Sequence, residues 1–520
     1  MADLPANLRR VLTLCAAALL AAACATTAPA KDGPAAAAAR APRPTRPWSD
    51  DVVYFVLVDR FADGDPDNDA GADPKSKGAF HGGDLEGLLD HLEEIASLGV
   101  TALWVNPLVT NIPSFVTGAG FPDWGYHGYW ADDFTRLDPR FGTEAQLKAL
   151  VEACHARGIK VLLDVVYNHA GYGTHYLTDP KFKGWLREGA ECGKDDLTSC
   201  IAGLPDFKTE LPEVREWLLD QQLGWAKKLN LDGFRLDTVK HVQHDFWQEH
   251  RKRTRAELFP GFFLLGEVWG GDPDVLAPWF DPDELDAGFD FGFQGSAIGF
   301  VQGRGRTVAF NRYLEQRVMK TRPGKLLAHF LSTHDSTGAL FTLQGDKTLF
   351  RLAAVLLFTS TGLPVVYYGE EVARAGGEWP ENRSDMPWGS KDILPGKGTP
   401  RDEALRRDYQ KLIALRTSRT ALSRGGHQGL STEGDLYLFL RRDAASGDAI
   451  VVAVNRGTTA ASATVPAPAE WGEGPVLDLF QAEGAADALP PLVREGARVK
   501  VTVPPRAARI LGVANPAALR

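Results

Sequence analysis

The feature that most constrains this chain is a repeated alternation of apolar runs and amphipathic stretches between residues 51 and 415. Continuous apolar runs such as 52–58 (VVYFVLV) are typical of parallel strands that are buried on both faces. Eight strand candidates with helical segments between most of them predict an α/β fold, a (β/α)8 TIM barrel with insertions. The strand candidates are 52–58, 101–105, 159–166, 231–237, 262–268, 287–291, 326–332 and 363–368, and one helix face is marked by Leu85, Leu88, Leu89, Leu92 and Ile95.

Two further regions accompany the barrel, which we expect to span residues 48–415. The segment 168–210 follows the third strand, is rich in Gly, Asp and Lys, and predicts a small inserted subdomain. From residue 420 onward the pattern changes to short β-rich runs with turn residues between them. This change predicts a C-terminal antiparallel β-sandwich over 416–520.

The N-terminus has the features of a targeting segment. Arg9 and Arg10 precede an apolar run that is too short to cross a bilayer, so residues 1–23 read as a signal peptide. The run closes with LAAAC, which resembles the lipobox of bacterial lipoproteins and predicts lipidation of Cys24; plain secretion after an Ala-x-Ala site is the alternative. Residues 24–47 are rich in Ala and Pro and predict an extended tether. We therefore expect an extracytoplasmic protein, either membrane-anchored (periplasmic or cell-surface) or secreted.

Cysteine use and net charge narrow the setting further. Cys192 and Cys200 flank a short polar loop and predict a disulfide in an oxidising compartment, whereas Cys154 has the spacing of a buried helical thiol. Lysine and arginine number 57 against 67 aspartates and glutamates, a net charge of −10 that argues against a nucleic-acid partner. We expect membrane contact only through the lipid anchor, and a monomer.

Polar residues gather where several strand candidates end. Asp164 ends the third, Arg235 and Asp237 the fourth, Glu267 the fifth and Asp335 the seventh. Because the carboxyl ends of barrel strands meet at one rim, Asp237, Glu267 and Asp335 should share one mouth. One carboxylate can attack a sugar carbon while a second carboxyl group protonates the leaving oxygen. Burial and the neighbouring negative charges should raise the pKa of that second group towards about 6 and keep it protonated.

At these residues the chain resembles the α-amylase superfamily, family 13 of the glycoside hydrolases. Four strand-end motifs of that family match in order, together with two further stretches. The six matches are 164–169 (DVVYNH), 204–207 (LPDF), 233–241 (GFRLDTVKH), 266–269 (GEVW), 330–335 (FLSTHD) and 362–371 (GLPVVYYGEE). The resemblance covers nearly everything from Val52 to the C-terminus.

The resemblance implies a role for each matched residue. Asp237 would be the nucleophile, Glu267 the general acid/base and Asp335 the residue that grips the sugar at the cleavage point. The implied sugar-binding residues are His127, Tyr129, His169, Arg235, Lys240, His334 and Arg383. The family's aspartate four positions before Arg383 is replaced by Trp379 in this chain, which puts the sugar contacts on that side in question.

The resemblance also implies calcium. The loop 63–84 is similar to the N-terminal calcium loop of cyclodextrin glucanotransferases, with Asp63, Asp65, Asn68, Asp69, Asp84 and the carbonyl of Gly82 as ligands. Hard oxygen ligands at short spacing suit calcium, although a solvated acidic turn is the plainer explanation. A second family site would use Asn168, Asp206 and the carbonyl of His241.

The expected activity is retaining, endo-type hydrolysis of α-1,4-glucosidic bonds in starch, glycogen or maltodextrins. A glucanotransferase or a cyclodextrinase or neopullulanase acting on the same glucans is the alternative. Ala202 argues against a cyclising enzyme, because cyclising relatives carry a bulky aromatic residue there. Two other classes remain: a non-catalytic glycan-binding lipoprotein, which the intact acid set opposes, and a metallohydrolase, which the absence of closely spaced histidine ligands opposes.

Overall fold

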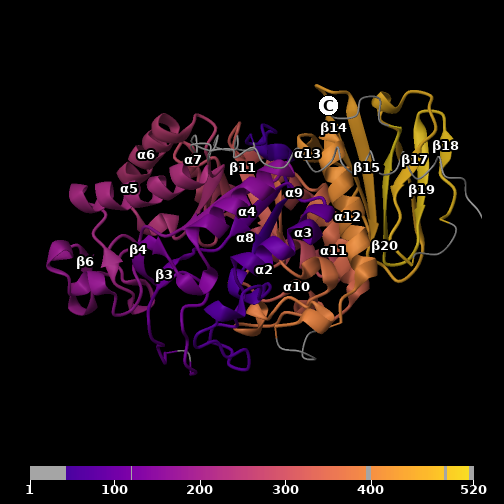
Figure 1. Cartoon of the computed structure of the whole chain (residues 1–520). Coiled ribbons are helices and arrows are strands. Elements are labelled where there is room, and N and C mark those ends of the chain that lie inside the picture. The colour runs from indigo at the N-terminus through magenta and orange to yellow at the C-terminus, as the bar shows by residue number, and fades with distance from the viewer. Residues whose placement is uncertain (1–41, 119, 394–399, 485–488, 515–520) are drawn as a thin grey trace, which may run out of the picture. The chain divides into compact units, whose positions relative to one another are not determined.

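The computed structural model describes residues 42–118, 120–393, 400–484 and 489–514. The predicted signal peptide and Cys24 lie outside these residues. Eight parallel strands close into a barrel in the order β1-β12-β11-β10-β9-β8-β5-β2 (Figure 1). These strands are β1 (Val53–Val56), β2 (Ala102–Val105), β5 (Lys160–Val165), β8 (Gly233–Leu236), β9 (Phe263–Gly266), β10 (Ala287–Asp290), β11 (Leu326–Phe330) and β12 (Leu363–Tyr367). All eight strand predictions and the TIM-barrel fold are confirmed.

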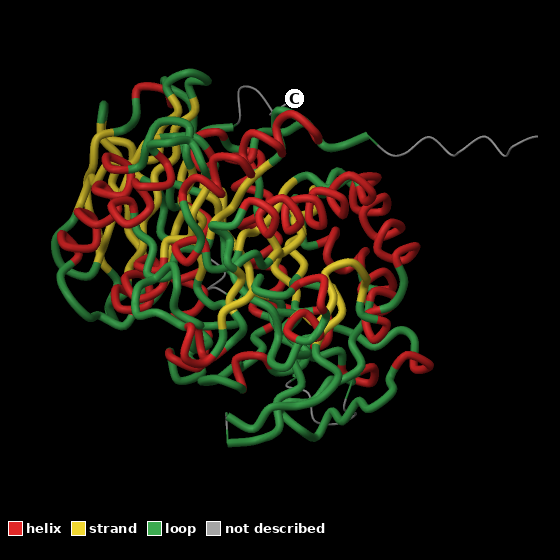
Figure 2. Tube along the Cα trace, turned by 90° about the vertical axis from the view of Figure 1, so that its left-hand side faces the viewer, coloured by secondary structure: helices red, strands yellow, loops and turns green. Residues whose placement is uncertain are grey.

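Helices surround the strands, as the tube in Figure 2 makes plain. They are α2 (Leu85–Asp90), α3 (Leu92–Ser97), α4 (Glu144–Ala156), α5 (Pro212–Leu229), α6 (His244–Arg253), α7 (Pro273–Phe280), α8 (Phe291–Val301), α9 (Thr307–Lys320), α10 (Ala339–Thr342), α11 (Lys347–Thr359), α12 (Glu403–Ser418) and α13 (Thr420–Ser423). Helix α4 begins with a capping box between Thr143 and Gln146. The stretch predicted as one helix from Leu85 to Ile95 is two, α2 and α3, divided at His91.

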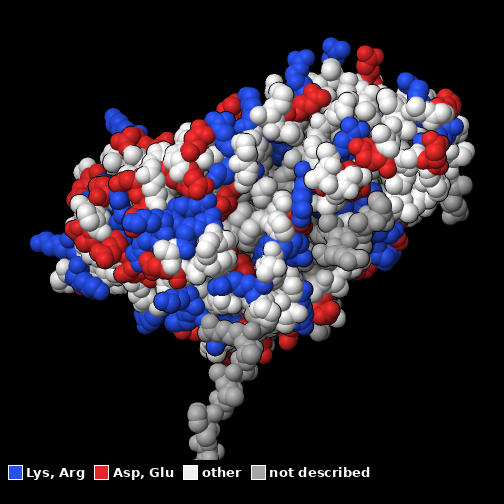
Figure 3. Space-filling view, turned by 90° about the horizontal axis from the view of Figure 1, so that it is seen from above, with Lys and Arg blue, Asp and Glu red and all other residues white. Residues whose placement is uncertain are grey.

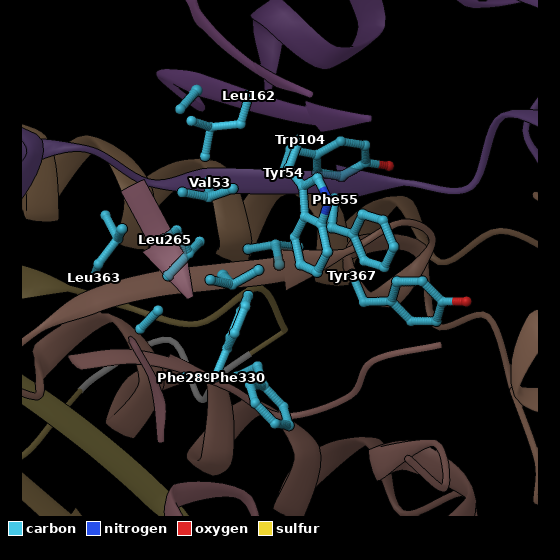
Figure 4. Close-up of a cluster of buried hydrophobic side chains, with 14 of the residues drawn as sticks. Val53, Tyr54, Phe55, Trp104, Leu162, Leu265, Phe289, Phe330, Leu363 and Tyr367 are labelled. Carbon is cyan, nitrogen blue, oxygen red and sulfur yellow. The ribbon is translucent and has the colours of Figure 1, made fainter. Parts of the chain in front are cut away.

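Aromatic side chains fill the barrel interior beneath the rim (Figure 4). The Phe55 and Trp104 rings stack with their centroids 3.6 Å apart, and Tyr367 stacks on Phe55 at 5.4 Å. Phe289 packs against Trp104 at 5.3 Å, and all four rings are buried. Large rigid rings of this kind form a densely packed floor beneath the polar residues at the strand ends.

The segment after β5 forms the predicted insertion. It contains a two-stranded antiparallel ladder, β6 (Leu186–Arg187) with β7 (Asp206–Phe207), and several short 3₁₀ turns. Cys192 and Cys200 are joined by a disulfide within it. A second small ladder, β3 (Val109–Asn111) with β4 (Ala131–Leu137), follows β2 and was not predicted.

The C-terminal region is built from two antiparallel sheets. One has the order β13-β14-β15-β20-β17 and the other β16-β19-β18. A cluster of buried aliphatic side chains, including Leu438, Val451 and Val501, lies between the sheets, as expected of a sandwich. The strands are β13 (Gly426–Ser431), β14 (Leu436–Asp443), β15 (Asp448–Asn455), β16 (Ala461–Pro466), β17 (Leu477–Phe480), β18 (Val493–Glu495), β19 (Arg498–Val503) and β20 (Ala507–Gly512).

The residues just before the barrel rest on its amino end. Arg46, at the end of the predicted tether, donates to Asp51 at 2.8 Å and to the carbonyl of Gly158 at 3.0 Å. The Trp48 ring stacks on Phe263, the first residue of β9. No helix in the described part of the chain is long and apolar enough to span a bilayer.

Candidate active site

The candidate site lies where the barrel strands end. Asp237 directly follows β8, Glu267 directly follows β9, and Asp335 lies in the loop after β11. Figure 1 shows the loops that follow β2 and β12 together at the lower edge of the barrel, which is therefore its carboxyl end. This is the rim on which barrel enzymes carry their active sites.

One buried arginine organises the acids. Arg235 Nη1 donates to Asp237 Oδ1 at 2.7 Å and to both oxygens of Asp164, at 3.0 and 3.2 Å. Arg235 Nη2 lies 3.8 Å from Glu267 Oε2. The guanidinium is only 2% exposed, so its charge acts on all three carboxylates with little screening by water.

Asp164 and the rings around it fix that arginine. The carboxylate accepts hydrogen bonds from Tyr129 Oη at 2.7 Å and from Trp104 Nε1 at 3.1 Å, in addition to those from Arg235. Burial raises the pKa of Asp164 to about 7 against the lowering effect of Arg235. Asp164 is thus a positioning residue beneath the mouth, and Tyr129 is held by its hydroxyl.

Glu267 has the protonation behaviour required of an acid catalyst. Burial raises its pKa to about 7; Arg235 opposes the rise and the negative charge of Asp237 adds to it. The backbone N–H of Thr238 donates to Glu267 Oε2 at 2.9 Å and fixes the carboxyl group next to Asp237. Near neutral pH, Glu267 can therefore hold or release a proton.

Asp335 has the opposite environment. Burial alone would raise its pKa, but His334 Nε2 at 2.9 Å and Arg383 Nη2 at 3.0 Å outweigh burial and hold the pKa below its ordinary value. Arg383 also donates through Nε to the carbonyl of His334 at 2.8 Å. The His334 ring lies parallel to Tyr129, with centroids 5.2 Å apart. Asp335 is thus a fixed anion beside an aromatic wall.

Most of the predicted sugar-binding residues share one pocket. Its walls include His127, Tyr129, His169, Asp237, His334, Asp335 and Arg383, all of which were predicted. Asp123, Trp130, Leu204 and Trp379 also line it. Sequence reasoning missed Asp123 and Trp130, although Trp130 directly follows Tyr129 and Asp123 lies four residues before His127.

Arg235 and Glu267 do not line this pocket, and Lys240 and His241 lie away from its walls on the side of the inserted segment. Lys240 Nζ is 3.5 Å from Asp196 Oδ1, and His241 Nδ1 is 2.7 Å from the carbonyl oxygen of Asp196. Asp196 lies inside the loop closed by Cys192 and Cys200. The disulfide loop therefore meets the 3₁₀ turn that follows Asp237.

The acidic loop 63–84 has features that suit a cation. Burial and the neighbouring Asp63 carboxylate raise the pKa of Asp69 to about 6. Asn68 Oδ1 and Asp69 Oδ1 are buried without a hydrogen-bond partner. Gly82 has φ +98°, and a Cβ there would collide with the Asp69 carboxylate. Asp84 is used otherwise: its oxygens accept from the backbone of Gly64, Asp65 and Gly87 and from the Asn68 amide, so it caps α2.

The second predicted ligand set also converges. The Asn168 side-chain amide reaches the carbonyl of His241 at 3.0 Å and Asp206 Oδ1 at 3.2 Å, and its oxygen faces both. Two arrangements satisfy three facing oxygens: a turned amide that donates to both partners, or a cation among them. Asp206 also accepts from Arg187 Nη1 at 2.7 Å. Among the described residues, no three acidic, histidine or cysteine side chains alone form a metal-binding group, so both sets depend on amide and backbone oxygens.

Comparison with known proteins gives a consistent result. The α-amylase catalytic-domain model matches residues 55–184 and 195–440. A cyclomaltodextrinase from Bacillus sp. is 31% identical over 78% of this chain and 73% of its own length. An α-amylase from Streptomyces lividans is 31% identical over 86% of this chain and 58% of its own.

A solved α-amylase structure from Anoxybacillus superposes with a TM-score of 0.78 at 31% identity, over 91% of this chain and all of that one. An α-amylase from Geobacillus thermoleovorans, complexed with acarbose, gives a TM-score of 0.75 at 30% identity, over 91% of this chain and 100% of that one. The barrel, the three acids at its carboxyl rim and these likenesses agree: the chain belongs to the α-amylase family of glycoside hydrolases.

Proposed function

We propose that this enzyme hydrolyses α-1,4-glucosidic bonds in starch-derived glucans and maltodextrins with retention of configuration. The observation that carries the proposal is the pair formed by Asp237, bound to Arg235 at 2.7 Å, and Glu267, whose buried carboxyl has a pKa of about 7. A retaining glycosidase needs one ionised carboxylate and one protonated carboxyl flanking the same bond. These two groups lie on either side of one guanidinium.

In the first step, Asp237 attacks the anomeric carbon and the glycosidic bond breaks. The leaving oxygen takes the proton of Glu267, so a glycosyl ester on Asp237 and a shortened glucan form. In the second step, Glu267, now a carboxylate, takes a proton from water as that water attacks the same carbon and Asp237 leaves. Asp335, His334 and Arg383 would hold the hydroxyl groups of the sugar that carries the reacting carbon.

Ring opening of cyclodextrins and cleavage of pullulan form the second candidate. It is supported by the likeness to cyclomaltodextrinases and to neopullulanase 2 from Thermoactinomyces vulgaris, which is 31% identical over 76% of this chain. Ala202, at the position where cyclising enzymes have an aromatic ring, has φ 53°, and its carbonyl accepts a hydrogen bond from Tyr172 Oη at 2.8 Å. A methyl side chain cannot serve as a core around which a glucan winds, so cyclisation is disfavoured.

Product analysis separates these candidates. Purified enzyme is incubated with amylose, pullulan and β-cyclodextrin, and products are followed by chromatography and by reducing-end release, with Asp237→Asn as the blank. Mixed linear oligosaccharides from amylose, formed faster than products from the other two, support the endo-hydrolase. Preferential opening of β-cyclodextrin supports the second candidate instead. Glucan binding without any release of reducing sugar would overturn both.

We also propose that calcium binds the loop 63–84, with Asn68 Oδ1 and Asp69 Oδ1 among its ligands. The support is the pair of buried, unpartnered oxygens and the raised pKa of Asp69. Bound cation would remove the repulsion among the acids and stabilise the native state. Chelation should then lower the melting temperature, calcium but not magnesium should restore it, and Asp69→Asn should weaken the effect. A melting temperature indifferent to chelator would contradict the proposal.

Counting the calcium ions bound per chain by calorimetry distinguishes the two arrangements at Asn168. If a cation lies among Asn168, Asp206 and the His241 carbonyl, calorimetry should count a second calcium ion per chain, and Asp206→Asn should remove it. If the amide simply donates to both oxygens, the count stays at one. Arg187 already neutralises Asp206, which makes this site the weaker of the two.

An extracytoplasmic location is the remaining part of the proposal, supported by the disulfide between Cys192 and Cys200. Expression of the full chain in a lipoprotein-processing bacterium, followed by fractionation and mass spectrometry, tests it. A lipid-modified Cys24 in the membrane fraction is the expected result. Cleavage before another residue would leave the secreted alternative.

A further inference from the structure

One wall of the pocket, lined by Asp335, Arg383 and Trp379, carries an aromatic ring at the position where the resemblance implies an aspartate. Trp379 lies four residues before Arg383, is 46% exposed, and lines the same pocket as Asp335 and Arg383. The polar contact that an aspartate would supply is therefore lost at this position. What replaces it can be deduced from the surroundings of the indole.

The segment that bears Trp379 is fixed against the site. Asn382 Nδ2 donates to the carbonyl of His334 at 2.8 Å and to that of Ser336 at 3.1 Å. Arg383 binds both the His334 carbonyl and the Asp335 carboxylate. Trp379 thus belongs to a segment, 379–383, that is hydrogen-bonded to the residues that would hold the reacting sugar.

A second ring supports the indole from behind. The Phe121 and Trp379 rings stack with centroids 5.3 Å apart and planes inclined by 28°. Phe121 in turn packs closely over Gly78, where a Cβ would collide with it. With one face covered by Phe121, the indole presents its remaining exposed surface as a rigid platform, the kind of surface on which the apolar face of a glucose ring packs.

A polar group accompanies the platform. Asp123 also lines the pocket, is 4% exposed, and its Oδ1 has no hydrogen-bond partner. The N–H groups that contact this carboxylate belong to Trp124 and Gly125, and they do not satisfy Oδ1. An unpaired buried acceptor is costly unless a ligand supplies the donor, and a sugar hydroxyl is a suitable one.

The position of Trp379 relative to the cleaved bond can be argued from the proposed roles of Glu267 and Asp335. Glu267 protonates the leaving oxygen, so it marks the leaving-group side. Thr238, whose backbone N–H donates to Glu267, begins the 3₁₀ turn that carries Lys240. Neither Glu267 nor Lys240 lines the pocket wall that carries Trp379. Trp379 instead shares its wall with Asp335 and Arg383, which the proposed function places at the reacting sugar, so we assign Trp379 to the glycone side.

We propose that Trp379, supported by Phe121, together with Asp123 forms a subsite for the glucosyl unit next to the cleaved one on its non-reducing side. This inference rests on the proposed glucan hydrolase activity. It assigns to stacking and one acceptor the recognition that the family's aspartate provides by hydrogen bonds. A substrate with at least two glycone units should gain from this subsite, and a substrate with one should not.

The test compares two substrates that share a leaving group. α-Glucosyl fluoride offers one glycone unit and α-maltosyl fluoride offers two, and fluoride release reports both. For Trp379→Ala, kcat/KM on the maltosyl substrate should fall about tenfold, equivalent to about 1.4 kcal/mol, while the glucosyl substrate changes less than about twofold. Trp379→Phe, which keeps an aromatic ring, should retain most of the wild-type kcat/KM on the maltosyl substrate. Asp123→Asn, which keeps an acceptor oxygen, should lose less than Asp123→Ala.

Phe341→Ala is the matched control, because Phe341 is also aromatic and 50% exposed but lines a neighbouring depression rather than the catalytic pocket. It should leave both substrates unchanged. Binding provides an independent readout: in a Glu267→Gln background, Trp379→Ala should weaken maltotriose about tenfold by calorimetry.

The outcomes separate the two proposals. If wild-type enzyme releases neither fluoride nor reducing sugar, the proposed function fails. If it does and Trp379→Ala loses equally on both substrates, or on neither, the subsite is overturned while the hydrolase assignment stands. Loss confined to the maltosyl substrate supports both.

Discussion

At the amino end of the barrel the buried acids Asp51 and Asp232 are paired with separate bases, whereas at the carboxyl end three buried acids surround one arginine. Asp51 is bound by Lys160 at 2.5 Å and by Arg46, and Asp232 is bound by His155 at 2.8 Å. Figure 3 views the molecule from the amino end, and basic and acidic side chains are interspersed over that face. Both buried acids there have a basic partner within hydrogen-bonding distance.

At the carboxyl end, the single guanidinium of Arg235 is shared by the carboxyl groups of Asp164, Asp237 and Glu267. A single positive charge cannot keep three buried carboxylates fully ionised, and Glu267 responds with a pKa of about 7. Imperfect pairing is destabilising, but it leaves one ionised and one protonated carboxyl group, as the proposed reaction requires. The same strand, β8, shows both arrangements, with Asp232 before it and Asp237 after it.

The strongest way to break this comparison is to neutralise the two aspartates that flank β8. Asp237→Asn removes the nucleophile and should lower kcat on amylose by at least about 10⁴-fold with an unchanged or higher free energy of unfolding. Asp232→Asn should leave kcat within about twofold and lower the free energy of unfolding by about 1–3 kcal/mol, because the carboxylate shared by His155 and the Val161 N–H loses its charge. Initial rates and urea unfolding of both variants provide the measurement. Residual activity above about 1% in Asp237→Asn would refute the nucleophile assignment.

A second test addresses the acid. Glu267→Gln keeps the shape and the acceptor for the Thr238 N–H but cannot give up a proton, so turnover of maltodextrins should fall by about 10²–10⁴-fold. Glycosylation by a glycosyl fluoride needs no proton at the leaving atom and should be nearly spared in a single turnover. Equal losses on glucan and fluoride in the glycosylation step would mean that Glu267 does not act as the acid.

The pH dependence of kcat/KM is the smallest of these effects, and its direction follows from the raised pKa of Glu267. The pKa of Glu267 is raised to about 7, and the protonated form is the active one in glycosidic cleavage. The value of kcat/KM should therefore fall on the alkaline side of about pH 7, by about tenfold per pH unit. Glycosyl fluoride hydrolysis, limited to its first step, should lack this limb. A flat profile to pH 9 on maltodextrin would place the acid elsewhere.

Much of this architecture was predictable because it depends on local pattern. Buried parallel strands are continuous apolar runs, so all eight were found, and Asp237 and Glu267 follow their strands directly in the sequence. The break at His91 was not predictable, because the leucine periodicity continues across it. There, His91 stacks on Trp388 with centroids 3.9 Å apart, a contact between residues nearly 300 positions apart.

The site itself was only partly predictable for the same reason. Motif positions supplied the residues proposed to act at the reacting sugar, but Asp123 and the pairing of Trp379 with Phe121 depend on two loops meeting in space. The raised pKa of Glu267 was expected in direction from crowding and burial. The low pKa of Asp335 was not, since it requires His334 and Arg383 to converge on that carboxylate.

The central claim is that Asp237 becomes covalently bonded to sugar during turnover. Glu267→Gln enzyme, which cannot activate water for the second step, is mixed with a 5-fluoro-α-glycosyl fluoride, digested and mapped by mass spectrometry. We predict one glycosyl unit per chain, attached to the peptide that contains Asp237 and absent from Asp237→Asn. An adduct on Asp335 or Asp164, or release of fluoride with no adduct at all, would contradict the account.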